Sequence, residues 1–424
     1  MKNEILITIL CVTFNHYNYI RDALDSIFRQ KVNFNYEIVV HDDASTDGTT
    51  DILREYEQKY PDKITVLYEV ENQYQKSESF DKFLQDIMLP YVRGKYVLSF
   101  EGDDYWIDET KLQRQVDYLE KHCDCMMVTH NAAVLNVKSV KVDTLTKYYS
   151  DRDLLPEEII NHPKGYLASA SMVMRRECYE TEGFFHEAGI GDYTRQLYSL
   201  TKGKVHYIDR IMSVYRFAHS GSWQESQEKD FTLRFCGYLK MVRFLDKYNA
   251  YTDYIYTKYI MKEIQRYAAY IIGIFDKVNI SEMLVNEVFD ETYKYYINYI
   301  IKLYKQINDD YYLDDEIAKF IEKHKHILIM GAGKYASVLA NQIRNSGRDF
   351  EGFVISSNRN AESLYMGKKV YKINEIPYNN QEIGLLVGIN AIIWDEIEST
   401  LLTHEIRNYF CPYLFDSNHK IDDI

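Results

Sequence analysis

The chain has 424 residues, and at roughly 100–200 residues per domain this length predicts two or three domains. Apolar residues make up 46% and charged residues 27% of the sequence, and the formal net charge is -14. Phosphate backbones bind clustered Lys and Arg, so this acidic balance excludes nucleic acid as the main partner and disfavours purely electrostatic docking on anionic lipid.

The first 125 residues alternate apolar runs with helical patterns. We expect strands over residues 5–14, 36–42, 63–70 and 95–100, separated by helices over residues 18–28, 49–60 and 79–89. Strands that alternate with helices predict a parallel sheet. The strands are nearly continuous apolar runs, as expected when helices cover both faces of the sheet.

The remaining chain changes character twice. Short apolar runs follow at 126–135, 166–175 and 204–217, and Gly then becomes scarce while Tyr, Ile, Leu and Lys recur at helical spacing. A new apolar strand at 326–333 begins another alternating pattern. We therefore predict an α/β domain over residues 1–225, a helical linker or bundle over 226–322, and a small separate α/β domain over 323–424.

An acidic pair ends the second expected strand. Asp42 and Asp43 follow a run of apolar residues, at the edge where open parallel sheets bind their ligands. A carboxylate there can accept a hydrogen bond from a pyrimidine imide or a ribose hydroxyl. We interpret the nearby Ser45 and Asp47 as caps of the following helix.

A second acidic motif, FEGDDYW, ends the fourth expected strand. Glu101 and Asp103 are two residues apart, so in extended backbone both carboxylates point to one side. Mg²⁺ usually takes one or two carboxylates together with substrate phosphates. Gly102 lets a ligand approach the backbone closely. The alternative is an acidic turn in which Asp104 caps a helix.

Two further segments carry chemistry-bearing side chains. Asp192 stands at the start of a helical stretch, where it can be an N-cap, a general base for an acceptor hydroxyl, or both. Farther on, His219 can bind a metal ion or a diphosphate, and Trp223 can stack on a sugar. A solvated loop is the alternative for this last segment.

The C-terminal strand leads into a GxGxxA motif at residues 331–336. This pattern before a helix suits phosphate binding at the helix N-terminus. The acid expected at the end of the next strand is missing, because Ser356 and Ser357 stand there. Close packing of helix on strand explains the glycines equally well, so we favour an interaction role, with a second copy of the chain or a partner enzyme.

Together, these segments resemble the family 2 glycosyltransferases, which have the GT-A fold, over about residues 5–225. The resemblance implies that Asp43 contacts the nucleotide base, with Asp42 and Thr13 beside it. It implies that Asp103 binds Mn²⁺ or Mg²⁺, while Glu101 and Gly102 lie near the ribose and the diphosphate. Here Glu101 replaces the first acid of the family's D-x-D signature.

The resemblance also assigns Asp192 as the catalytic base. One segment departs from the family: where a Gly-rich stretch and an Arg often follow residues 71–73, this chain has YQKSESF, and Lys76 is a candidate substitute. Residues 323–424 resemble, more loosely, the Rossmann-like nucleotide-binding domain that precedes sugar acyltransferases.

The expected function is thus an inverting, metal-dependent transfer of a hexose from a UDP-sugar or similar donor to a hydroxyl. The acceptor would be a glycan or a lipid-linked or protein-linked glycan. We expect a cytoplasmic protein, associated peripherally with the inner membrane face if the acceptor is lipid-linked, since no stretch reaches ~18 uninterrupted apolar residues. Two other classes stay open: a non-catalytic nucleotide-sugar-binding scaffold, and a sugar-modifying oxidoreductase that uses the C-terminal domain.

Overall fold

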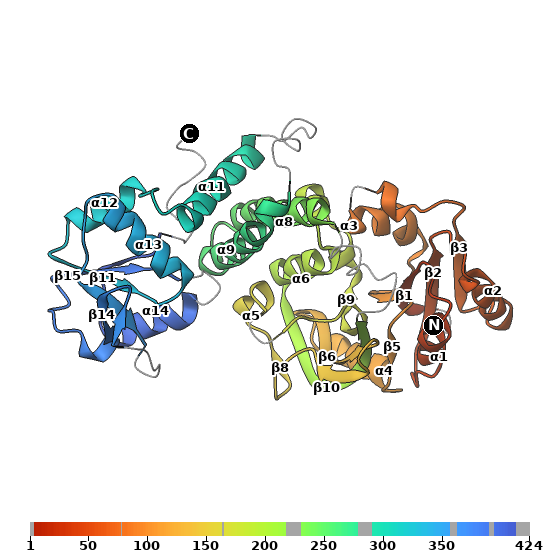
Figure 1. Cartoon of the computed structure of the whole chain (residues 1–424). Helices are drawn as coiled ribbons and strands as arrows, with labels where there is room; N and C mark the ends of the chain where they lie inside the picture. Colours follow the sequence, from red (N-terminus) through yellow and green to blue (C-terminus); the bar gives the residue numbers. More distant parts are fainter. Residues whose placement is uncertain are drawn as a thin grey trace. The chain divides into compact units, whose positions relative to one another are not determined.

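The protein forms two compact units, residues 1–259 and 260–424, each of which is described by itself (Figure 1). The computed structural model describes residues 4–77, 79–162, 165–217, 230–278, 291–356, 363–389 and 394–412. The unit boundary lies inside the segment 226–322, whose described part consists mainly of helices, with non-helical connections at residues 252–256 and 309–314. The division into three domains at 225 and 322 stays a prediction.

Four parallel strands form one half of the N-terminal sheet, in the order β3-β2-β1-β4. Their bounds are β1 (Ile5–Thr13), β2 (Asn35–Asp42), β3 (Ile64–Tyr68) and β4 (Tyr96–Glu101). This arrangement confirms the predicted parallel pairing. The helices α1 (Ile20–Phe28), α2 (Thr49–Lys59) and α4 (Lys111–Lys121) pack their apolar stripes on one face of these strands.

The other half of the sheet is mixed. Strand β9 (Val173–Arg175) runs antiparallel to both β4 and β6 (Cys125–Asn136), and β6 runs parallel to the long strand β10 (Lys204–Phe217). The short strand β5 (Tyr105–Trp106) pairs with β10, and β7 (Lys141–Thr144) and β8 (Arg152–Asp153) lie beside the main path. Consequently the end of β10 lies next to the residues that directly follow the FEGDD motif.

The predicted helix over 79–89 is broken into three short turns. These are α3 (Phe80–Phe83), a π-helical turn over Leu84–Met88 and a 3₁₀ turn over Leu89–Tyr91. Ser79 caps α3 by accepting a hydrogen bond from the Lys82 amide at 3.2 Å. Pro90 has no N–H to donate, so the helical hydrogen bonding stops there.

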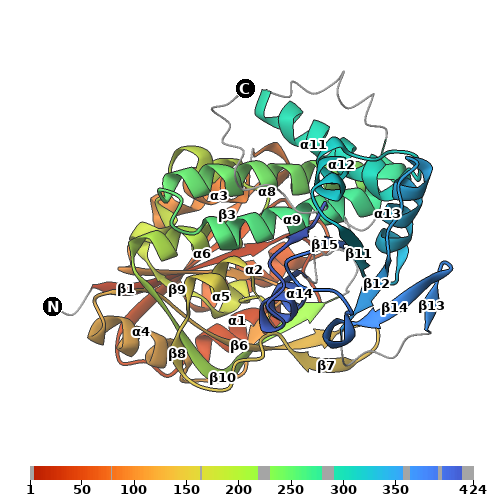
Figure 2. The same ribbon diagram turned by 90° about the vertical axis from the view of Figure 1, so that its left-hand side faces the viewer.

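Two helices cover the face of the N-terminal sheet opposite α1 and α4 (Figure 2). They are α6 (Gly191–Lys202) and α8 (Phe231–Tyr251), and α5 (Pro156–Ile160) precedes them in the chain. Phe185 packs against Phe244 and Tyr248 of α8 with ring centroids 5.8 and 6.3 Å apart. These rings form part of an aromatic core beside α8, and all six cysteines are free thiols.

The C-terminal unit is a second α/β layer structure with the strand order β13-β14-β12-β11-β15-β16, parallel except for β13. The strands are β11 (His326–Met330), β12 (Gly352–Ile355), β13 (Leu364–Tyr365), β14 (Lys368–Lys372), β15 (Ile383–Val387) and β16 (Tyr409–Phe410). The helices α12 (Asp315–Glu322) and α13 (Lys334–Asn345) pack on one face and α14 (Trp394–Thr403) on the other. The helices α9 (Thr257–Ile274) and α11 (Glu291–Asn308) precede this sheet.

The centre of the N-terminal sheet should dominate the stability of its unit. Leu98 in β4 is fully buried in the apolar core, whereas Leu155 is 48% exposed. We expect Leu98→Ala to lower the free energy of unfolding by about 2–5 kcal/mol, because it removes buried methyl groups and leaves a cavity. Leu155→Ala should stay within about 0.5 kcal/mol of wild type. Urea unfolding followed by fluorescence checks this, and equal losses for both variants would contradict it.

Candidate active site

The carboxyl ends of β1, β2 and β4 bring the predicted donor-side residues to one edge of the sheet. Thr13 pairs with Asp42, and Val12 pairs with Glu101. The Asp43 amide donates to the Thr13 carbonyl at 3.0 Å, and the Gly102 amide donates to the Val12 carbonyl at 2.9 Å. The two acidic motifs are therefore neighbours across β1, where open parallel sheets bind ligands.

Asp42 and Asp43 are both buried, but they hold different parts of the chain. Asp42 accepts hydrogen bonds from the Ser45 amide at 3.1 Å and the Thr50 hydroxyl at 2.6 Å, so it stabilises the turn into α2. Asp43 accepts from the amides of Gln73 at 2.6 Å and Tyr74 at 3.2 Å. Asp43 thus anchors the segment after β3 at the site, a contact that sequence spacing did not indicate.

Neither predicted cap is the N-cap of α2, which is Gly48. Asp47 precedes the N-cap and accepts from the Thr49 amide at 3.0 Å. Ser45 does not cap this helix, because its hydroxyl accepts from the Asn15 amide at 2.9 Å. Ser45 instead ties the loop after β1 to the loop after β2.

Lys76 lies in a 3₁₀ turn over Tyr74–Lys76 and forms an ion pair with Glu71. Its side chain is 51% exposed. The predicted contact of Lys76 with a nucleotide stays a prediction, and it would require this surface ion pair to open.

Gly102 lies in a narrow cradle. A Cβ atom added at this residue would lie 3.0 Å from each of three atoms: Thr13 Oγ1, His16 Nδ1 and Ile20 Cδ1. The His16 Nε2 atom is 4.0 Å from Asp103 Oδ2. His16 was not among the predicted site residues, although its place directly after β1 puts it at the same edge of the sheet.

Arg216, near the end of β10, fixes the turn that carries Asp103. Its amide donates to Asp104 Oδ1 at 2.9 Å, and its guanidinium donates to the Asp103 carbonyl at 2.6 Å. The same guanidinium lies 4.3 Å from the ring centroid of Tyr105. The alternative in which Asp104 caps a helix is wrong: α4 begins after Thr110, and Asp104 instead binds the backbone of β10.

Asp192 is the second residue of α6 rather than its N-cap, which is Ile190. Its carboxylate accepts from the Tyr193 amide at 2.8 Å and from the Ser169 hydroxyl at 3.1 Å. Each carboxylate oxygen therefore accepts one hydrogen bond, Oδ1 from the next residue and Oδ2 from a residue 23 positions earlier in the chain. The N-cap interpretation is wrong in position, and the proposed base role does not depend on it.

The carboxylates of Glu101, Asp103, Asp104 and Asp192 form one group around Tyr215, which we name the acidic cluster. Burial raises the pKa of Tyr215, and the charges of all four carboxylates raise it further. Glu101 keeps contact with solvent, yet desolvation by the surrounding protein and the charges of Asp103 and Asp192 raise its pKa to about 8. Hydrogen bonds connect the same two segments: Ser169 donates to Asp192 at 3.1 Å, and the next residue, Ala170, accepts from the Trp106 indole at 3.1 Å, two residues after the FEGDD motif.

The acidic cluster suits a hard divalent cation only together with further ligands. Within the described ranges, no three His, Cys, Asp or Glu side chains are arranged to hold a metal ion by themselves. The oxygen donors of Asp103 fit Mg²⁺ or Mn²⁺, with substrate phosphates completing the coordination. His219, the second predicted metal ligand, and Trp223 lie outside the described residues.

Backbone packing explains only part of the glycine motif of the C-terminal unit, because Gly331 is closely packed whereas a Cβ atom at Gly333 would meet no described atom within 4 Å. A Cβ atom at Gly331 would lie 2.8 Å from the Gly388 carbonyl oxygen, and one at Gly388 would lie 2.8 Å from the Ala336 Cα. The ends of β11 and β15 and the start of α13 thus touch through small residues. These contacts support the packing alternative, and the interaction role of this unit stays a prediction.

The chain is similar to known proteins mainly over its N-terminal half. A family model described as glycosyl transferase family 2 matches residues 8–182. An uncharacterised protein of Mycobacterium tuberculosis is 28% identical over 219 residues, which cover 52% of this chain and 61% of that protein. The Escherichia coli protein named UDP-Glc:alpha-D-GlcNAc-diphosphoundecaprenol beta-1,3-glucosyltransferase WfaP is 29% identical over 115 residues, or 27% of this chain and 41% of WfaP.

The chain therefore spans less than two thirds of the length of these curated relatives. Among solved structures, Staphylococcus aureus TarS 1-349 in complex with UDP-GlcNAc matches with a TM-score of 0.45 and 16% identity, covering 80% of this chain and 89% of that one. A mannosyltransferase from Pyrobaculum calidifontis in complex with GDP-Man and Mn²⁺ matches with a TM-score of 0.42 and 16% identity, covering 70% and 84%.

The cradle around Gly102 predicts a sharp response to one added methyl group. We expect Gly102→Ala to lower the free energy of unfolding by about 1–3 kcal/mol, because three side chains must move to admit the Cβ. Gly237 in α8 is the matched control, since no atom of a described residue blocks its Cβ position within 4 Å. Gly237→Ala should instead stabilise the protein by about 0.5–1 kcal/mol. Chemical denaturation measures both, and a stabilising Gly102→Ala would refute the cradle.

Proposed function

We propose, on the premise that residues 8–182 form a family 2 glycosyl transferase domain with the predicted α/β fold, that this protein transfers a sugar from a nucleotide-diphosphate donor to a hydroxyl acceptor. The observation that carries the proposal is the acidic cluster. Asp192, from α6, accepts from Ser169, and the adjacent Ala170 carbonyl accepts from Trp106, which follows the FEGDD motif. The charge of Asp192 also raises the pKa of Glu101, the last residue of β4. A donor-binding edge and a candidate base therefore lie together.

The donor would lie along the ends of β1, β2 and β4. Asp43 would accept a hydrogen bond from the nucleotide base, and its two backbone contacts hold it in place. Asp42 lies beside it, and the Thr13 hydroxyl is buried, with no hydrogen-bond partner among the described residues. Glu101 and Gly102 would face the ribose and the diphosphate.

Asp192 would accept the proton of the acceptor hydroxyl. The acceptor oxygen forms a bond to the anomeric carbon as the bond from that carbon to the phosphate oxygen breaks, and the nucleoside diphosphate leaves with the electron pair. One displacement with one base inverts the anomeric centre. A divalent cation held by Asp103, with His219 as a further candidate ligand, supplies positive charge against the leaving diphosphate when bound.

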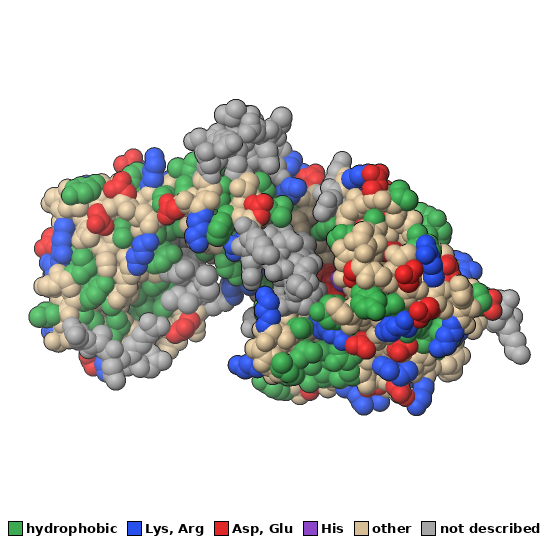
Figure 3. All heavy atoms as spheres, turned by 45° about the vertical axis from the view of Figure 1, so that its right-hand side comes forward, with side chains coloured by type: hydrophobic (Ala, Val, Ile, Leu, Met, Phe, Trp, Pro, Cys, Tyr) green, Lys and Arg blue, Asp and Glu red, His purple; other side chains and the backbone are tan. Residues whose placement is uncertain are grey.

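The substrate class extends this proposal. We favour a UDP-sugar donor and a glycan, lipid-linked or protein-linked acceptor. The name of WfaP, which includes a diphosphoundecaprenol acceptor, supports the lipid-linked case. In the described ranges no helix has the length and apolarity to cross a bilayer. An action at the cytoplasmic membrane face would therefore need peripheral contact. On the face that Figure 3 shows, acidic and basic side chains are interspersed.

The base assignment is tested by Asp192→Asn. We expect this variant to lose transfer by about 10²–10⁴-fold, because the amide cannot take the acceptor proton. The dissociation constant of the donor should stay within about twofold, since the base contacts the acceptor rather than the donor. Product formation across a panel of nucleotide sugars and calorimetric donor binding measure the two quantities. Asp209→Asn, on an exposed position of β10, is the control. Wild-type turnover in Asp192→Asn would remove Asp192 from the reaction.

Donor binding separates the roles of the two acidic motifs. Calorimetry with UDP, with Mn²⁺ or with EDTA, should show that Asp103→Asn loses the manganese-dependent part of the affinity. Asp43→Asn should weaken binding under both conditions, by the ~1.5–3 kcal/mol typical of a hydrogen bond to a charged group. The same titration with NAD tests the oxidoreductase alternative. Tight NAD binding without UDP binding would sink the glycosyl transfer proposal.

A further inference from the structure

The start of α6, which carries Asp192, is packed directly against α3. A Cβ atom added to Gly191 would lie 2.8 Å from Phe80 Cδ1 and 3.3 Å from Asp81 Oδ1. Gly191 permits this close contact because it has no side chain. The residue next to the candidate base is thus held by the segment between β3 and β4.

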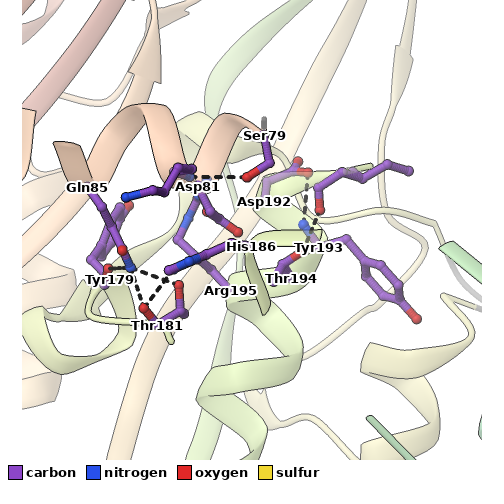
Figure 4. A network of polar contacts seen from close by, with 12 residues as sticks. Ser79, Asp81, Gln85, Tyr179, Thr181, His186, Asp192, Tyr193, Thr194 and Arg195 are labelled. Atoms are coloured by element: carbon purple, nitrogen blue, oxygen red, sulfur yellow. Dashed lines mark hydrogen bonds and ion pairs between the residues drawn. The ribbon is translucent and has the colours of Figure 1, made fainter. Parts of the chain in front are cut away.

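A buried ion pair joins the same two helices (Figure 4). Arg195 Nη1 pairs with Asp81 Oδ1, and the side chains are 1% and 5% exposed. Arg195 Nε and Nη2 have no hydrogen-bond partner within the described part of the chain. The guanidinium lies 5.4 Å from the ring centroid of Phe80 and 5.1 Å from that of Tyr179. Asp81 therefore supplies the hydrogen bond and the ion pair of a guanidinium that also lies over two aromatic rings.

The pair lies within the electrostatic surroundings of the acidic cluster. Arg195 follows Asp192 by three residues on α6, and residues at this spacing lie on one side of a helix. The charge of Arg195 counteracts the rise in the pKa of Glu101, to which Asp192 contributes. Burial raises the pKa of Asp81 to about 6, against the charge of Arg195 and with that of Asp192.

A second set of contacts fixes the same segment to the chain that leads into α6. Gln85, in the π-helical turn, donates to the carbonyls of Thr181 at 2.6 Å and Tyr179 at 3.2 Å (Figure 4). The His186 ring contacts the Thr181 carbonyl at 2.8 Å. Hydrogen bonds therefore fix the turn from residue 179 to 186 to the segment between β3 and β4. The close contact at Gly191 fixes the first turn of α6 to α3.

A buried ion pair such as Asp81–Arg195 contributes more to the relative placement of its two helices than to the stability of the fold. Two buried charges must be desolvated, and apolar residues of similar volume are often as stable or more stable. A buried pair with a rigid, directional guanidinium nevertheless fixes one arrangement of the two helices. Stability alone gives no reason to keep Asp81 and Arg195 next to an already acidic site.

We propose that Asp81 and Arg195 are positioning residues, which fix the start of α6 against α3. They thereby direct the Asp192 carboxylate toward the other three carboxylates of the acidic cluster. The inference rests on the proposed function, in which Asp192 is the base. It adds that the segment between β3 and β4, anchored at Gln73 and Tyr74 by Asp43, also sets the acceptor side of the site.

The test compares kcat with donor affinity in a variant that buries no unpaired charge. Asp81→Asn alone would leave Arg195 unpaired and could unfold the protein, so the double variant Asp81→Leu with Arg195→Met carries the test. We expect it to fold, to bind UDP as wild type does, and to lose about 10–100-fold in kcat, because small misplacements of a catalytic group have effects of this size. Arg195→Lys keeps the charge without the planar fork and should give a smaller loss in kcat.

Glu37 provides the matched control. It is 4% exposed and pairs with Arg93, but it lies near the amino end of β2, at the opposite end of that strand from Asp42. Glu37→Gln should lower the melting temperature while leaving kcat unchanged. Amide hydrogen exchange over residues 190–196 should accelerate in the Asp81/Arg195 double variant and not in Glu37→Gln.

The outcomes separate the two proposals. A folded double variant with wild-type kcat, or with unchanged exchange over 190–196, would overturn the positioning role. Faster exchange in that double variant, in a protein whose wild type transfers no sugar from any donor tested, would support the placement of α6 by Asp81 and Arg195 and refute the proposed function.

Discussion

Parallel pairing of β1 with both β2 and β4 is the constraint on which the site depends. The register sets Thr13 beside Asp42 and Val12 beside Glu101, so that two acidic motifs separated by more than fifty residues end at the same edge. A slip of one residue would turn every side chain of β1 to the other face of the sheet. The buried apolar residues of β1 therefore specify the site as well as the core.

Carboxylates grouped at that edge repel one another, which lowers the stability of the folded state. Two arginine side chains offset part of this repulsion. Arg216 holds the turn of Asp103 and Asp104, and Arg195 lies behind Asp192. Neither cation cancels the repulsion within the acidic cluster. Burial raises the pKa of Glu101, and the charges of Asp103 and Asp192 raise it further, against the charge of Arg195. A cluster of like charges with perturbed pKa values is typical of a functional site. A bound cation and a polar substrate there can offset the repulsion that remains in the folded protein.

The segment between β3 and β4 connects both sides of this arrangement. Asp43 holds its beginning at Gln73 and Tyr74, and Arg195 holds Asp81 a few residues later. Its broken helical structure, with one π-helical turn, follows from Pro90 and from these two anchors. A regular helix over 79–89 would not satisfy the contacts of Gln85 with the turn at 179–186.

Much of this protein could be predicted from residue order alone. Apolar runs and helical spacing determined the parallel strands and the helices α1 and α2, and the acids at strand ends marked Asp43, Glu101 and Asp103, because these signals depend on near neighbours in the chain. Only the tertiary structure decided that Asp104 binds β10, that Tyr215 lies among four carboxylates, and that Asp81 pairs with Arg195. Asp104 lies 112 residues from Arg216 in the chain, and Asp81 lies 114 residues from Arg195, and no local periodicity encodes such separations. The packing of the whole domain determines these pairs. A buried charge is stable only beside an opposite charge or a hydrogen-bond partner, and the tertiary fold decides which residue lies there.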